Sequence, residues 1–154
     1  MRLAVLGWVL AAAGGVPGAI AQDAPEAEGI TAWEGTCSAD SMLSRPGEAE
    51  AAYGCNGMIR MVFPEPGHEQ LIFLRKGDNE SLVAFGGNLD AAGDLVLTNV
   101  QFRPVKATLV DGRCAIRREG GVPRHIRCEA KASDGSGGAA RIDFAVDKQI
   151  DLKN

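Results

Sequence analysis

The segment 113–130 constrains the fold of this chain more than any other, because residue types recur there at mirrored positions around the pair Gly120-Gly121. If the chain turns at these two glycines, a single antiparallel register matches three pairs: Cys114 with Cys128, Ile116 with Ile126, and Arg113 with Glu129. The cysteines and isoleucines then share one face, and the charged pair lies on the other. The segment is therefore predicted to be a β-hairpin with a buried and a solvated face.

The chain has four cysteines, Cys37, Cys55, Cys114 and Cys128. An even number of cysteines in an exported chain indicates disulfides, and four of them allow three pairings. The hairpin register favours Cys114 with Cys128, which leaves Cys37 with Cys55 by elimination. Each bridge would close a loop of roughly 15 to 20 residues and stabilise the fold by about 3 kcal/mol.

A metal-binding or redox role is not expected for these cysteines. The chain has no Cys-x-x-Cys motif, and its two histidines, His68 and His125, do not lie at zinc-ligand spacing from a cysteine pair. Asp90 and Asp94, which flank Gly93, resemble only a fragment of a calcium loop. We therefore predict no cofactor and no metal.

The N-terminal residues indicate export. Residues 1–21 combine one arginine, an apolar run and a small-x-small ending at Ala21, as in a secretory signal peptide cleaved after that alanine. A membrane anchor would need about 20 uninterrupted apolar residues, and Pro17 breaks this run. We predict a protein of the periplasm or the secreted space, with no transmembrane segment after cleavage, a flexible acidic arm over 22–29 and one β-domain over 30–154.

The rest of the chain has the alternation typical of short strands separated by turns. Strands are expected over 30–37, 59–63, 70–75, 81–85, 95–102, 106–110 and 141–146, in addition to the hairpin. A long loop is expected over 38–54. The prediction is an all-β domain, a small antiparallel β-barrel or β-sandwich of about eight strands stabilised by two disulfides.

Several local features are also predicted. Gly86-Gly87 indicates a β-bulge, and the apolar pattern changes phase near Asn99. Asp111-Gly112 is a typical hairpin dipeptide and predicts a turn. The nearly continuous apolar run 70–75 predicts a strand buried on both faces, and 48–52 has the composition of a helical turn.

Basic residues gather on the predicted hairpin, although the whole chain has a formal net charge of −4. The binding hypothesis assigns five of them to a docking strip: Arg113, Arg117, Arg124, His125 and Arg127. Arginine suits this role because its guanidinium binds carboxylate or phosphate with two hydrogen bonds. The alternative is a solvated outer face that prevents edge-to-edge aggregation. Nucleic acid is not an expected partner, because the chain is acidic overall and has few aromatic residues.

No catalytic constellation is evident in the sequence. Ser136 stands in a flexible polar turn rather than in a Gly-x-Ser-x-Gly elbow, and acidic residues such as Glu65, Glu69 and Asp78 fall in predicted turns. Trp33 and Tyr53 are expected in the core, although in a barrel open at one end they would line a ligand cavity.

The run Tyr53-Gly54-Cys55 before a strand is similar to small periplasmic lysozyme-inhibitor barrels over these residues alone, and no family is assigned. The sequence thus predicts a non-enzymatic binding or accessory protein, inhibitor-like or a complex subunit, that recognises an envelope or extracellular protein. The alternatives are an open-barrel carrier of a small hydrophobic or anionic ligand and, with less support, a small hydrolase. The oligomeric state is not predicted.

Overall fold

The computed structural model describes residues 27–103 and 108–152, which form strands and no helix. The predicted signal peptide and most of the predicted acidic arm lie outside the described residues. The strands are β1 (Gly29–Cys37), β2 (Met42–Ser44), β3 (Ala51–Ala52), β4 (Gly57–Val62), β5 (His68–Arg75), β6 (Asp78–Leu89), β7 (Leu95–Phe102), β8 (Thr108–Glu119), β9 (Val122–Ala132) and β10 (Ala139–Ile150).

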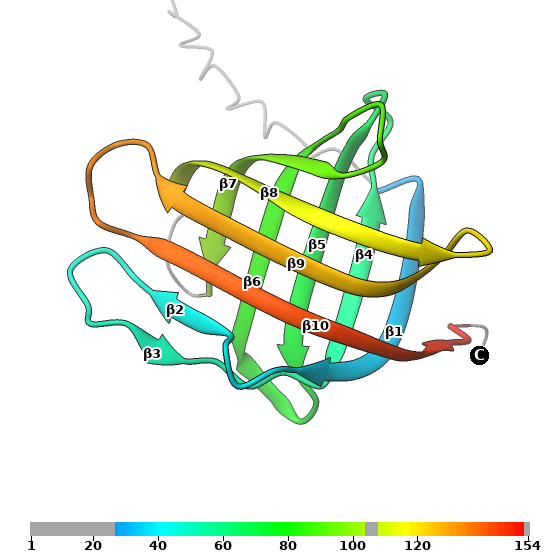
Figure 1. The fold of residues 1–154 in the computed structure, drawn as a ribbon, viewed down its shortest axis with the longest axis horizontal. Coiled ribbons are helices and arrows are strands. Elements are labelled where there is room, and N and C mark those ends of the chain that lie inside the picture. Colours follow the sequence, from blue (N-terminus) through cyan, green and yellow to red (C-terminus); the bar gives the residue numbers. More distant parts are fainter. Residues whose placement is uncertain (1–26, 104–107, 153–154) are drawn as a thin grey trace, which may run out of the picture.

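Eight of these strands close into an antiparallel barrel (Figure 1). Strands β4 to β10 follow one another as neighbours, and β1 closes the barrel by pairing with β4 on one side and β10 on the other. The all-β prediction is confirmed, and the closed ring of strands makes the architecture a barrel rather than a sandwich.

Strands β2 and β3 lie outside this ring, within the segment 38–54 that was expected to be a loop. One edge of β10 pairs first with β2, at Arg141 and Met42, and then with β1, at Phe144 and Cys37. The predicted helical turn over 48–52 is wrong, because Ala51–Ala52 instead pairs with β2.

Asp143 stands where β10 changes partner, and two serines supply the hydrogen bonds that a continuous strand would make. The Ser38 amide donates to the Asp143 carbonyl at 2.7 Å. The Asp143 amide donates to Ser41 Oγ at 3.0 Å, and Ser41 is buried.

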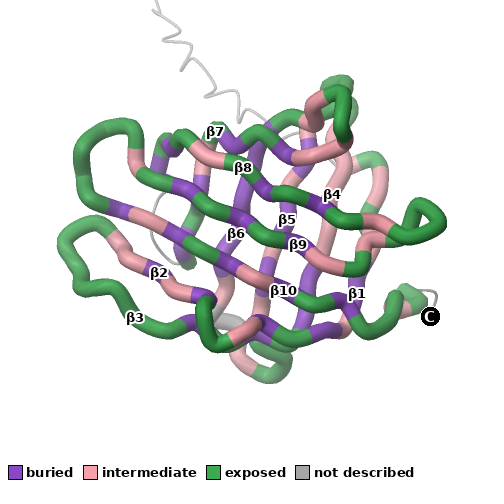
Figure 2. The backbone as a smooth tube through the Cα atoms, viewed as in Figure 1, coloured by how far each residue is buried: buried purple, intermediate pink, exposed green. Residues whose placement is uncertain are grey.

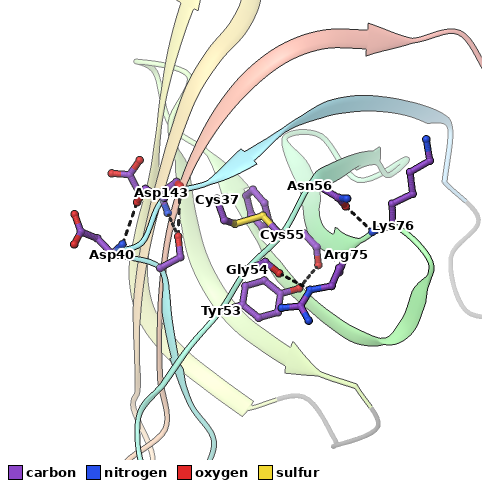
Figure 3. The surroundings of a disulfide bond; sticks show 12 residues. Cys37, Asp40, Tyr53, Gly54, Cys55, Asn56, Arg75, Lys76 and Asp143 are labelled. Carbon is purple, nitrogen blue, oxygen red and sulfur yellow. Dashed lines mark hydrogen bonds between the residues drawn. A yellow bond between two sulfur atoms is a disulfide. The ribbon is translucent and has the colours of Figure 1, made fainter.

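Both predicted disulfides are confirmed, Cys37 with Cys55 and Cys114 with Cys128. Two disulfides fit a protein of an oxidising compartment such as the periplasm or the extracellular space. Beside the first bridge, Tyr53 donates its hydroxyl proton to the Phe73 carbonyl at 2.9 Å (Figure 3). The hairpin register is also confirmed, with all three predicted pairs directly opposite one another across β8 and β9.

Two other predictions about strands are wrong. Asp111-Gly112 does not form a turn, because β8 runs through both residues, and a Cβ on Gly112 would lie 2.2 Å from the Glu129 carbonyl oxygen. This glycine permits close approach of β9 rather than a reversal of the chain. The strand over 70–75 is buried on one face only, since Ile72 lies half-buried on the outside. The bulge at Gly86-Gly87 and the phase change near Asn99 are confirmed as register shifts.

Buried and exposed residues alternate along the strands (Figure 2), because side chains at every second position point into the barrel and fill its interior. Phe73, Phe85, Phe102 and Phe144 are fully buried, and the Phe73 ring meets those of Phe85 and Phe144 edge-on at 5.8 Å and 5.5 Å. Trp33 and Tyr53 are buried as well, which confirms that they belong to the core.

One ion pair lies among these inward-facing side chains. Arg60 on β4 stands opposite Leu71, and Glu69 lies two residues before Leu71 on β5. Arg60 Nε donates to Glu69 Oε2 at 2.6 Å and Nη2 donates to Oε1. The Glu69 side chain is 3% exposed and that of Arg60 is 33% exposed, so the carboxylate depends on the guanidinium for its hydrogen bonds. These hydrogen bonds raise the pKa of Arg60 above its usual value.

Candidate binding face on strands β8, β9 and β10

The outward side chains of β8, β9 and β10 form a regular array, which we call the charged face. Strand registers align it in four rows of three: Asp111–Lys131–Ala139, Arg113–Glu129–Arg141, Ala115–Arg127–Asp143 and Arg117–His125–Ala145. Inward residues between these positions, such as Cys114, Ile126 and Ile142, are buried in the core. The alternation that builds the barrel therefore also presents nine titratable side chains on one outer surface.

A groove of about 840 Å³ runs over this face. Its lining includes Arg113, Ala115 and Arg127 from the charged face, and Met42 and Glu50 from the β2–β3 segment. Small side chains make its floor, because Gly112 and several alanines stand between the long charged side chains. The face is thus hollowed where a partner would need space for its own side chains.

Arg113 is held by the turn between β6 and β7. Its Nη2 lies 2.7 Å from Asp90 Oδ2 and its Nη1 lies 3.0 Å from Asp94 Oδ2. Asp90 Oδ1 accepts the amides of Ala92 and Asp94, and Asp94 Oδ1 accepts the amide of Ile116. The Asp94 amide is the largest of the influences that lower the pKa of Asp90. Both carboxylates are therefore fixed in place before they meet Arg113.

Asp143 holds two other basic side chains. His125 Nε2 lies 2.7 Å from Asp143 Oδ1, and Arg127 Nε and Nη2 donate to Oδ2 at 3.2 Å and 2.8 Å. Burial raises the pKa of Asp143, but the hydrogen bonds from Arg127 and His125 outweigh it and keep this pKa below its usual value. The backbone of Asp143 is fixed where β10 changes partner from β2 to β1. His125 and Arg127 are therefore held by a residue in a fixed position. Arg127 stays 58% exposed and Arg113 52% exposed, which leaves both accessible to a partner.

Four of the five predicted binding residues lie on the charged face: Arg113, Arg117, His125 and Arg127. Arg124 does not, because the register shift between β8 and β9 leaves it unpaired beside the turn, where it lies 3.6 Å from Glu119.

Sequence reasoning missed the carboxylates that hold the arginines of this face. Asp90, Asp94 and Asp143 come from elements outside the hairpin, and nothing in the local pattern links them to its arginines. The predicted hairpin register already places Glu129 opposite Arg113, and the same register places Asp111 opposite Lys131.

The outer surface on the other side of the barrel has a different chemistry. One row across β10, β1, β4, β5 and β6 reads Ile150–Ala32–Ile59–Ile72–Ala84 and contains no charged residue, and its Ala32 and Ala84 are buried. Two residues further along β1, Glu34 pairs with Lys148 and Lys76. Charge is therefore present on this side too, but it does not form the continuous array found on β8 to β10.

Other candidate sites have less support. Among residues 27–103 and 108–152, no group of three or more His, Cys, Asp or Glu is arranged to hold a metal ion. The carboxylates of Asp90 and Asp94 bind Arg113, and that of Glu69 binds Arg60. In the same described segments, no helix is long and apolar enough to cross a membrane.

Comparison with protein-family models, curated proteins and solved structures finds no match to this chain.

Proposed function

We propose that this protein is an exported, non-enzymatic binding protein that docks an envelope or extracellular protein on the charged face. The observation that carries the proposal is the fixed orientation of its arginines. Arg113 is held by Asp90 and Asp94, whose carboxylates accept backbone amides, and Arg127 is held by Asp143, so little side-chain entropy is lost when a partner contacts them. The Cys114–Cys128 bridge ties together the two strands that present them.

The presence of both acidic and basic side chains on the charged face supports a protein partner rather than a polyanion. Acidic Asp111, Glu129 and Asp143 alternate with the basic residues of the face, and a uniform polyanion would meet them as well as the arginines. A protein surface can place opposite charges at each position, which gives specificity through complementary potentials.

The test is affinity capture from an envelope extract by the mature chain, residues 22–154 with both disulfides intact. Arg117→Glu is the informative variant, because this exposed arginine has no ion pair among the described residues. Lys76→Glu is the control outside the charged face: it makes the same charge change in the β5–β6 turn, and the exposed pair of Lys76 with Glu34 that it removes contributes little to stability. We expect one stoichiometric protein that wild type and control retain, and that Arg117→Glu and raised salt release.

Retention of the same protein by both Arg117→Glu and Arg127→Glu would remove the charged face from the proposal. Absence of any stoichiometric protein would contradict docking itself and direct attention to small ligands.

A further inference from the structure

The rows of the charged face are complementary to themselves. A two-fold axis that lies in the plane of the sheet, across the strands and between the second and third rows, would stack two copies face to face. The first row then meets the fourth, and the second meets the third. Each half of the interface then contains three pairs of oppositely charged side chains, one from each copy: Asp111 with Arg117, Glu129 with Arg127, and Arg141 with Asp143.

A two-fold axis shifted by one row, between the first and second rows, matches only two pairs in each half, Asp111 with Arg113 and Lys131 with Glu129. An axis parallel to the strands through β9 would bring Arg127 against Arg127 and Glu129 against Glu129. In the matching arrangement only Lys131 and His125 are basic groups that meet, and Ala139 meets Ala145. Packed sheets keep their strands within about 30° of each other, so neighbouring rows stay close enough to pair.

The intramolecular ion pairs fit the same arrangement. Asp111, Glu129 and Arg117 have no ion pair among the described residues, and each finds an opposite charge in the second copy. Arg141 donates from Nε only to the Asp40 carbonyl, and it would meet the carboxylate of Asp143. Arg113, which two aspartates already neutralise, is the arginine that would face an alanine, Ala115. Arg127 and Asp143 already pair with each other within one chain, so in the dimer they would extend that pair into a network with Glu129 and Arg141 of the second copy.

From this pattern we infer that the charged face pairs with a second copy of this chain in a two-fold, salt-sensitive dimer. The inference rests on the proposed function in taking this face as a docking surface, and it names one protein that fits it. Three strands and four rows span roughly 400 Å² per copy. The surface area buried on both copies together is less than the value of about 1,200 Å² at which standard stable interfaces begin. The dimer is therefore a weak one that a tighter partner displaces.

The test is sedimentation equilibrium of the mature, disulfide-intact chain at low and at high salt, at concentrations up to about 1 mM for a contact of this size. We expect a dimer that dissociates as salt rises. Asp111→Arg and Arg117→Asp each place like charges at two symmetric positions, so each should weaken the dimer by about tenfold or more. The double variant Asp111→Arg/Arg117→Asp restores opposite charges across the axis and should dimerise as wild type does. Lys76→Glu should leave the dimer unchanged.

A wild-type chain that stays monomeric at low salt would overturn the inference, as would a double variant no better than the single ones. A dimer that the single variants do not weaken would place the contact on another face and overturn it equally. These failures are separate from failure of the proposed function: a monomer whose capture of a protein depends on Arg117 refutes only the dimer. A salt-sensitive dimer with no Arg117-dependent capture refutes only the docking of another protein.

Discussion

Replacing Arg60 with methionine should destabilise the barrel strongly, because it leaves the Glu69 carboxylate inside the protein without its partner. The Glu69 side chain is 3% exposed, and both of its oxygens accept hydrogen bonds from Arg60. Removing one partner of a fully buried pair costs about 3 to 5 kcal/mol. Arg60 is itself 33% exposed, so some water reaches this end of the pair. We therefore expect a loss of about 2 to 4 kcal/mol, a large share of a typical total of roughly 5 to 15 kcal/mol.

The assay is urea unfolding of Arg60→Met, Glu69→Leu and the double variant, followed by tryptophan fluorescence. Glu69→Leu should cost less than Arg60→Met, because the guanidinium it leaves unpaired is already partly solvated. The double variant removes both charges and keeps similar volumes, so its free energy of unfolding should return close to that of wild type.

A loss of less than about 1 kcal/mol in Arg60→Met, or a double variant as unstable as Arg60→Met, would show that this pair does not offset the burial of the Glu69 charge.

Three further predictions concern stability. Burial raises the pKa of Tyr53, the single tyrosine, to about 12. Its ultraviolet absorbance should therefore stay that of the neutral phenol above pH 10, and stability should fall between about pH 10 and pH 12, since the unfolded chain ionises first. The double variant Cys114→Ala/Cys128→Ala opens a bridge of sequence separation 14 and should lose about 3 kcal/mol in denaturant unfolding; a loss near zero would mean that the strand pairing alone constrains this loop. Gly112→Ala should lower the melting temperature, at a cost of about 1 to 3 kcal/mol, because its Cβ would enter the backbone of β9, whereas Gly29→Ala, with its nearest atom at 3.9 Å, should not.

The parts of this fold that the sequence predicts are those set by local patterns. The register of the β8–β9 hairpin could be predicted from the sequence because the cysteines, the isoleucines and a charge pair all favour the same alignment. Asp111-Gly112 misled the prediction because the dipeptide suits both a turn and a strand that another backbone approaches closely. Which of the two applies depends on β9, and so on a contact that the dipeptide itself does not encode.

For the same reason, the arginines of the charged face could be predicted from the sequence, but the carboxylates that orient them could not. The positions of Arg113, Arg117 and Arg127 follow from alternation along one hairpin. The carboxylates that orient two of them come from Asp90 and Asp94 on the β6–β7 turn and from Asp143 on β10. These contacts exist only once the barrel is assembled, so no window of sequence contains them.

Closure of the barrel by its first and last strands also sets the order in which the chain can fold. Strand β1 pairs with β10, so the N-terminal strand must wait until the C-terminal one has been synthesised. Until then β1 and the growing meander each present an unpaired edge, which invites association with other unfinished chains. The Cys37–Cys55 bridge needs only the first part of the chain and can form before the later strands are available. Completion of the ring is a non-local and therefore late event, so a chain truncated before β10 should aggregate rather than persist as a smaller domain.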